Sequence, residues 1–304
     1  MAPPPGGPGA PGGVVIGAPA EMTRLYRTMG LVAGAGAVPF AASVSFLRAP
    51  SPDSTLTLLA LSLPSRALGF AREGERYAAS YVARVQLRQG ATVVRTIEST
   101  EQVRVPTFRE TSRTDESIVW QQFIRLAPGR YTLLVSVKDE SSIRASSEEV
   151  SLEVPRLAPN GFTSPVPVYE AIPRQSVDSL PRLLARPRST FVYGVDSLLP
   201  LYIDGVTPSS PAEVRVRVLG DGEIVGLDST MQLPTRGAAR STTIGIPVSR
   251  LPVGINTIEI TAPGRPDTAR TRALITLGED VPIGTFEEMI TYLRWFTTQD
   301  RLRT

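Results

Sequence analysis

The sequence contains no cysteine and no histidine among its 304 residues, and Lys138 is its single lysine. Without cysteine the chain can form no disulfide and offers no thiolate nucleophile. Without histidine it lacks the usual zinc ligand and the commonest general acid–base group. Carboxylates, hydroxyls and Lys138 are therefore the groups left for metal binding or acid–base chemistry.

Acidic residues stand side by side at several places, in sequence typical of a turn or a helix end. Among these pairs are Asp139/Glu140, Glu148/Glu149, Glu279/Asp280 and Glu287/Glu288. A calcium site needs about six to eight oxygen ligands, more than such a pair supplies. The chain also lacks a phosphate-binding loop, a nucleophile elbow and EF-hand spacing. We therefore predict no enzymatic activity, no metal site and no cofactor.

Charge is nearly balanced, with 32 basic and 29 acidic residues. The arginines fall mostly on polar strand faces and alternate with glutamate. Nucleic-acid binding usually needs a clustered basic face, so we expect no nucleic-acid partner.

Proline and glycine are abundant, at 28 and 25 residues, which suits a chain with many turns. Between Tyr77 and Leu87 apolar and polar residues alternate, the pattern of a half-buried antiparallel strand. Gln89-Gly90 then forms a hairpin turn, and Thr55–Leu63 and Ile118–Leu126 are further strands. The pattern predicts an all-β protein with two immunoglobulin-like β-sandwich domains in tandem.

Composition divides the chain into five segments. They are a Pro/Gly-rich arm with a short helix (1–37), sandwich 1 (38–155), a Pro-rich connector (156–189), sandwich 2 (190–278) and a C-terminal amphipathic helix (279–304). The two sandwiches share a local pattern, because Leu126–Val135 matches Leu251–Ile260 in its Leu, Gly, Thr and branched positions. In both stretches a turn glycine leads into a strand.

The short helix is expected from Glu21 to Gly30. Four apolar residues recur at helical spacing, and Gly30 suits the C-terminal cap. They are Met22, Leu25, Tyr26 and Met29. A helix this short is marginal alone and needs a surface to lie on. We therefore take these four residues as candidate partner-binding residues.

Twenty residues from Thr28 to Leu47 carry no charge, which leaves two interpretations. The length suffices for an uncleaved membrane anchor. Glycines and Pro39 interrupt the stretch, and Phe40–Leu47 favours a strand.

The C-terminal segment has a capping box, Thr285 with Glu288, followed by an apolar helical stripe. This helix either packs on its own domain or faces a partner or a membrane. Under the second interpretation Tyr292, Trp295 and Phe296 join the candidate partner-binding residues.

Several stretches resemble the N-terminal β-sandwich region of bacterial GWxTD-domain proteins. They are Leu25-Tyr-Arg-Thr-Met-Gly30, Val38-Pro-Phe40, Asp53-Ser-Thr-Leu56, Leu61-Ser-Leu-Pro64, Thr107-Phe-Arg-Glu-Thr-Ser112, Leu126-Ala-Pro-Gly-Arg-Tyr131 and Val154-Pro-Arg-Leu-Ala-Pro159. The Gly-Trp-x-Thr-Asp sequence that names the family is absent. The resemblance implies an envelope protein without enzymatic activity.

The resemblance extends to an accessory structural subunit that braces a reaction-centre–light-harvesting complex in phototrophic bacteria. It implies a non-enzymatic scaffold that docks on a larger membrane-associated complex at the periplasmic face, with protein partners and at most peripheral membrane contact. Because histidine is the usual axial ligand of bacteriochlorophyll, we expect no direct pigment ligation. The alternative function is an envelope carbohydrate- or peptide-binding module, which would need exposed aromatic residues.

Overall fold

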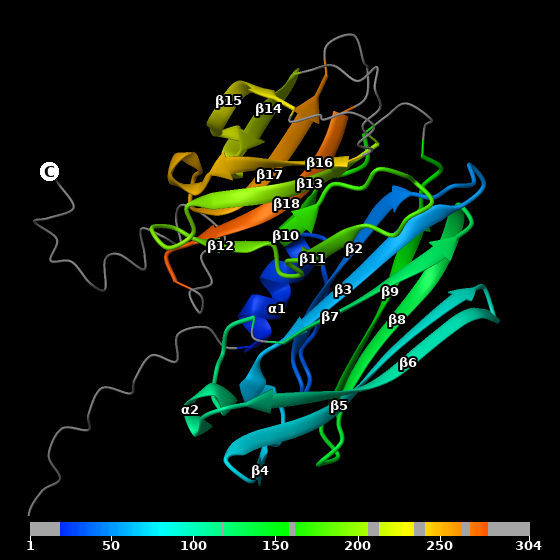
Figure 1. Ribbon diagram of the computed structural model, residues 1–304, viewed down its shortest axis with the longest axis vertical. Coiled ribbons are helices and arrows are strands. Elements are labelled where there is room, and N and C mark those ends of the chain that lie inside the picture. Colours follow the sequence, from blue (N-terminus) through cyan, green and yellow to red (C-terminus); the bar gives the residue numbers. More distant parts are fainter. Residues whose placement is uncertain are drawn as a thin grey trace, which may run out of the picture.

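A computed structural model describes residues 19–116, 118–157, 162–205, 213–233, 241–262 and 268–278. Within these residues the chain is almost entirely β-strand and turn, with two short α-helices, α1 (Pro19–Thr28) and α2 (Phe108–Thr111). Single 3₁₀ turns lie at Ser65–Ala67, Asp221–Glu223 and Val248–Arg250. The strands form two β-sandwiches, with α1 beside their junction (Figure 1). The predicted all-β class is confirmed.

The first sandwich has an inner sheet, in contact with the second sandwich, and an outer sheet. The inner sheet has the order β1-β2-β3-β7, and the outer sheet the order β4-β5-β8-β9 with β6 also paired to β5. The bounds are β1 Val32–Gly34, β2 Phe40–Arg48, β3 Thr55–Leu63, β4 Ala71–Glu73, β5 Arg76–Gln89, β6 Thr92–Val105, β7 Ile118–Leu126, β8 Gly129–Asp139 and β9 Ala145–Val154. The predicted strands at Thr55–Leu63 and Ile118–Leu126 have these bounds in the structure.

The second sandwich also has an inner and an outer sheet. The inner sheet has the order β11-β10-β13-β16 and the outer sheet the order β12-β18-β17-β14-β15. The bounds are β10 Val166–Ile172, β11 Arg182–Ala185, β12 Thr190–Val192, β13 Leu198–Asp204, β14 Glu213–Leu219, β15 Val225–Gln232, β16 Ser241–Pro247, β17 Gly254–Thr261 and β18 Thr268–Thr276. The described pairings are antiparallel except that of β12 with β18.

The sequence match between the two halves marks equivalent strands. Strands β6-β5-β8-β9 of the first outer sheet correspond in order to β15-β14-β17-β18 of the second. In β8 the Tyr131 hydroxyl donates to the carbonyl of Ala127 at 2.9 Å. At the matching place in β17 the Asn256 amide donates to the carbonyl of Pro252 at 2.8 Å. Different side chains thus close the same corner in both sandwiches, in the manner of a tyrosine corner.

The structure corrects the expected connector at 156–189, because β10 and β11 lie inside it and belong to the second sandwich. The strands accommodate these prolines because of where the prolines lie: Pro173 directly follows β10 and Pro181 directly precedes β11. Pro167 lies within β10, where its carbonyl accepts the Arg186 amide at 2.9 Å. The proline-rich composition reflects short strands between turns and not a linker.

The inner sheet of the first sandwich is covered on both faces. Every residue of β3 is buried. Leu59, Leu61 and Leu63 face the first sandwich's core, whereas Leu56, Leu58 and Ala60 face the second sandwich. The inter-sandwich core is completed by Leu47, Val166, Val168, Leu183, Ala185 and Tyr202. Strands buried on both faces have nearly continuous apolar sequence, and this explains much of the uncharged stretch at 28–47.

The predicted strand at Phe40–Leu47 is β2 of this sheet. β1 lies within the expected arm segment 1–37, and its pairing with β2 makes it part of the first sandwich. Of the helices in the described residues, none has the length and apolar character needed to span a membrane.

A buried ion pair of the second sandwich is hydrogen-bonded to the backbone of the first. Asp204, at the end of β13, accepts hydrogen bonds from Arg174 Nε at 2.9 Å and Nη2 at 2.5 Å. The same carboxylate accepts the amide of Arg48, at the end of β2, at 2.8 Å, and Arg174 Nη2 donates to the Arg48 carbonyl. The two side chains are 2% and 0% exposed. Carbonyls of Val177 and Ser179 accept from Arg174 Nη1, so each guanidinium nitrogen has a partner.

Helix α1 packs on its own chain. Its end is closed by Gly30, at a φ of +85° that favours glycine, where Gly30 and Leu31 amides donate to the Arg27 and Tyr26 carbonyls. The observed helix starts and ends two residues earlier than expected. Tyr26 and Met29 are buried against a cluster that includes Leu274 of β18. The surface that this helix needs is thus supplied by both sandwiches.

Replacing Arg174 by Met is expected to lower the free energy of unfolding by about 3–5 kcal/mol, because Asp204 would keep a buried charge without its cation. The matched control is Arg156→Met, which removes an exposed ion pair with Asp53 and should cost less than about 1 kcal/mol. Urea unfolding of both variants measures the difference. Equal losses would contradict the role given to the buried pair.

A chain starting at residue 19 keeps α1 and the contacts described above, so its melting temperature should match that of the full chain. A chain starting at residue 31 loses Tyr26 and Met29 from the interior. At about 1.5–3 kcal/mol for each buried side chain, it should lose roughly 3–6 kcal/mol of stability. Thermal unfolding of both truncated chains tests this. If the chain that starts at residue 31 is as stable as the full chain, the helix contributes no packing energy.

Candidate docking site

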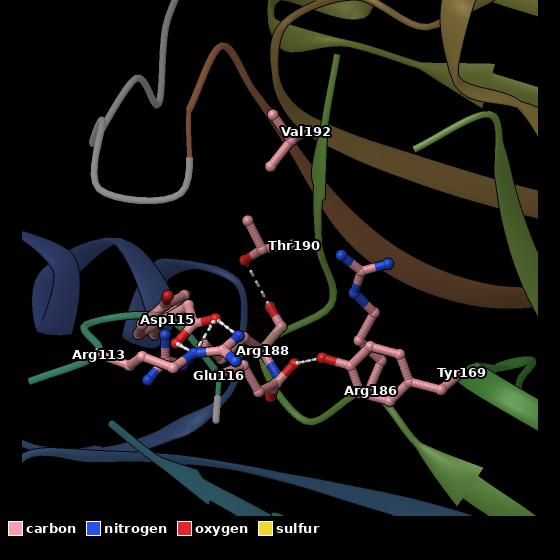
Figure 2. A pocket seen from close by; sticks show the side chains of 9 residues that line it. Arg113, Asp115, Glu116, Tyr169, Arg186, Arg188, Thr190 and Val192 are labelled. Carbon is pink, nitrogen blue, oxygen red and sulfur yellow. Dashed lines mark hydrogen bonds and ion pairs between the residues drawn. The ribbon is translucent and has the colours of Figure 1, made fainter. Parts of the chain in front are cut away.

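A polar cavity of about 220 Å³ lies where α1, the loop between α2 and β7, β10 and the β11–β12 segment meet (Figure 2). It is lined by Tyr26, Arg113, Asp115, Glu116, Tyr169, Arg186, Arg188, Thr190 and Val192. Three arginines and two carboxylates thus come together from both sandwiches. Their partners decide which of these charges is available to a ligand.

Arg186 is held rigidly by the protein itself. Its two terminal nitrogens each donate to one carboxylate oxygen of Asp196 at 3.0 Å. The guanidinium carbon lies 4.1 Å from the ring centre of Phe191 and 5.0 Å from that of Tyr169. Asp196 also accepts the amide of Val192 at 2.7 Å. A bidentate ion pair with two ring contacts makes Arg186 a fixed wall of the cavity.

Both carboxylates that line the cavity already have donors. Glu116 accepts the Tyr169 hydroxyl at 2.5 Å and the Arg188 amide at 3.0 Å, and Figure 2 shows that hydroxyl directed at the carboxylate. Burial raises the pKa of Tyr169, and the neighbouring Glu116 charge raises it further, so the phenol stays a donor at neutral pH. Asp115 accepts Arg113 Nε at 2.9 Å.

Arg188 is the exception among these charges. Its Nε donates to the Ser62 hydroxyl of β3 at 3.2 Å, which fixes the side chain against the first sandwich. Its two terminal nitrogens have no protein partner among the described residues. The side chain is half-buried and lines the cavity. The arrangement can therefore bind an anionic group by two parallel hydrogen bonds.

A second cavity, of about 350 Å³, lies between the C-terminal end of α1, β2 and β18. Its two arginines are both engaged, because Arg270 pairs with Glu259 at 2.8 Å and Arg272 donates to the Thr28 carbonyl at 3.0 Å. Hydroxyl groups and apolar side chains make up most of its remaining wall. This cavity presents no arginine comparable to Arg188.

The structure corrects part of the predicted partner-binding set. Tyr26 and Met29 are 7% and 6% exposed, and Met22 and Leu25 pack partly against the same cluster. These four side chains therefore face the chain's own sandwiches, although Tyr26 lines the first cavity and Met29 the second. Tyr292, Trp295, Phe296 and the helix predicted at 279–304 lie outside the described residues, so for these the prediction stands as made.

Sequence reasoning missed Arg186 and Arg188 because they lie in the segment read as a connector. A density of arginine around β11 was visible in the sequence, but nothing local indicated that residues 113–116 and 186–192 meet. Their meeting depends on the packing of one sandwich on the other.

Among the acidic pairs, Asp139 has a structural role. Its buried carboxylate accepts the Ser141 and Ser142 hydroxyls at 2.9 Å and 2.7 Å and Arg144 Nη2 at 2.7 Å, which closes the β8–β9 turn. Burial alone would raise the pKa of Asp139, but these hydrogen bonds outweigh it and hold the pKa below its usual range. Across the described ranges, no group of three or more acidic residues is arranged to hold a metal ion.

Because the pKa of Asp139 is lowered by folding, its contribution to stability is present at neutral pH and is lost as the pH falls through the folded-state value. We expect Asp139→Asn to be less stable than the native chain at pH 7 and to lose less further stability on acidification below about pH 4. Urea unfolding at both pH values provides the measurement. If acidification lowered the stability of both chains by the same amount, protonation of this carboxylate would not be coupled to folding.

No protein-family model matches the chain, and no curated protein matches it. Among solved structures it is similar to the BSP domain of a biofilm-associated protein, with 8% identity, a TM-score of 0.24, and coverage of 77% of this chain and 51% of that one. It is also similar to dimeric latent PorU from Porphyromonas gingivalis, with 11% identity, a TM-score of 0.33, and coverage of 80% of this chain and 20% of that one. A third similar structure is a tetra-tandem repeat of a large adhesion protein, with 14% identity, a TM-score of 0.23, and coverage of 79% of this chain and 50% of that one. The chain thus spans about half of the first and third chains and a fifth of the second, and these distant likenesses carry no functional argument.

Proposed function

We propose that the chain is a non-enzymatic structural subunit that docks on a larger membrane-associated complex at its periplasmic face and stabilises it. The sequence resemblance points to a reaction-centre–light-harvesting complex as that assembly. In this role the chain contributes rigidity and contact surface and ligates no pigment.

The observation that carries the proposal is the joint between the two sandwiches. A shared apolar core and the buried Arg174–Asp204 pair connect them. The Gln121 side chain of β7 adds two hydrogen bonds to the backbone of β11, at Leu183 and Ala185. A subunit that braces an assembly must keep the distance between its contact points, and a joint of this kind does so, whereas a flexible linker would not.

The test is purification of the affinity-tagged full chain from membranes of its source cells in mild detergent. We expect reaction-centre and light-harvesting polypeptides to be recovered in fixed ratio with it, together with their pigment absorption. An unrelated tagged envelope protein, purified in parallel, is the control. Recovery of the chain without these polypeptides would overturn the assignment.

A second measurement separates bracing from mere association. Complexes isolated from cells that lack the chain should keep their pigment content and lose their native absorption at a lower temperature. Equal heat stability with and without the chain would contradict a structural role, and loss of pigment would contradict the absence of ligation.

The alternative, an envelope carbohydrate- or peptide-binding module, is favoured by one observation. Tyr169, at the rim of the polar cavity, is 40% exposed. Its ring is partly occupied by the Arg186 guanidinium, which leaves less of it for stacking on a sugar. Saturable quenching of the chain's intrinsic fluorescence by envelope oligosaccharides would support this alternative against the structural role.

A further inference from the structure

The uncovered face of the β10–β11 hairpin lies beside the polar cavity. Glu170 of β10 pairs with Leu184 of β11, and Ile172 pairs with Arg182, so these four side chains share one face. Ile172 and Leu184 are 60% and 37% exposed. The outer sheet of the second sandwich ends at the short strand β12, and this face is left in solvent. We call Ile172, Leu184 and Tyr169 the apolar strip.

The apolar strip leads into the cavity. Tyr169 belongs to both, and Arg186, which lines the cavity, lies two residues after Leu184 and directly after the end of β11. Beyond this wall Arg188 presents its two terminal nitrogens. Figure 2 shows Tyr169 and Arg186 together on one side of the cavity, with Arg113, Asp115 and Arg188 on the other. The apolar strip and Arg188 are thus connected by the cavity that Tyr169 and Arg188 both line.

We propose that this surface binds an extended segment of a partner protein in which an acidic side chain pairs with Arg188 and neighbouring apolar side chains cover the apolar strip. The proposal rests on the proposed docking function for the nature of the partner. It names the place of contact and the chemistry of the segment.

Charge complementarity selects an acidic group over a basic or neutral one. The residues lining the cavity include three arginines and two carboxylates, and both carboxylates already accept hydrogen bonds from the protein. Arg113 and Arg186 are likewise paired with Asp115 and Asp196. Glu116 stays close to Arg188 and opposes an incoming anion, but the donors from Tyr169 and the Arg188 amide offset its charge. Among the described residues that line the cavity, a lysine in the segment would find no unpaired carboxylate; the exposed Glu170 lies on the face of the apolar strip and outside the cavity.

Position also favours Arg188. Its backbone amide is anchored to Glu116 and its Nε to Ser62, so the guanidinium is held before any ligand arrives. Pre-organisation of this kind reduces the entropy lost on binding. A carboxylate can accept two parallel hydrogen bonds from the planar guanidinium of an arginine, whereas the ammonium group of a lysine at the same position would offer no such planar pair of donors.

The test uses two labelled peptides, both acetylated and amidated so that their ends are uncharged. One has a glutamate followed by leucines at alternate positions, and the other has glutamine in place of the glutamate. Fluorescence polarisation with the full chain should show about tenfold tighter binding of the glutamate peptide, the size expected for one charge-assisted pair. Equal affinities, or no binding at millimolar concentration, would overturn the proposal.

Three variants assign the effect. Arg188→Gln should abolish the preference for glutamate, and Arg188→Lys should keep only part of it because the paired geometry is lost. The matched control is Arg217→Gln on β14, an exposed arginine of the outer sheet that should leave both affinities unchanged. Unchanged melting temperatures establish that each variant is folded. A preference that survives Arg188→Gln would refute the site.

The same variants in the tagged chain separate this inference from the proposed function. If the native chain and Arg217→Gln recover the membrane complex while Arg188→Gln recovers much less, both stand. If all three recover it equally, the docking function stands and the site fails. If none recovers it while the peptides still discriminate, the site stands and the proposed assembly fails.

Discussion

Burial of the inner sheet of the first sandwich on both faces is the constraint on which the rest of the structure depends. One face belongs to the core of its own sandwich, but the other carries Leu56, Leu58 and Ala60 and needs a second cover. The second sandwich supplies it through β10, β11 and β13, and α1 covers the neighbouring residues Ala33 and Ala41. The apolar area that would be exposed on separation makes the two sandwiches one unit.

The polar joint acts differently from this apolar contact. Hydrophobic burial is roughly proportional to area and sets little geometry, whereas the Arg174–Asp204 pair is satisfied only when the end of β2 meets the end of β13. Replacing it by apolar residues could leave the stability unchanged, but loss of one partner leaves a buried charge. The pair therefore specifies how the sandwiches meet, and the cavity beside Arg188 exists only in that arrangement.

The sequence predicted several strands of the first sandwich, including β3, which is buried on both faces, and missed β10 and β11 of the second. Alternation marked β5, because one of its faces meets solvent, and β8 and β17 were found through the turn glycine and strand that they share. At β10 and β11 the prolines suggested a connector. A strand accommodates a proline only where the missing N–H needs no partner, and the sequence does not show which positions these are. The helix predicted at Glu21–Gly30 was found, yet part of its covering surface, Leu274, is more than 240 positions away. Periodicity shows that a face needs covering and gives no information on what covers it.

The candidate site follows the same logic. Arg188 is unremarkable in a sequence with 32 basic residues. Its distinction comes from neighbours in both sandwiches, Ser62 and Glu116 in one and its own strand connection in the other. A contact made at Arg188 is therefore made at the joint itself, and it engages both sandwiches at once. Because the joint is fixed by buried groups, a partner held there is positioned relative to the far ends of both sandwiches, which is the mechanical requirement of a brace.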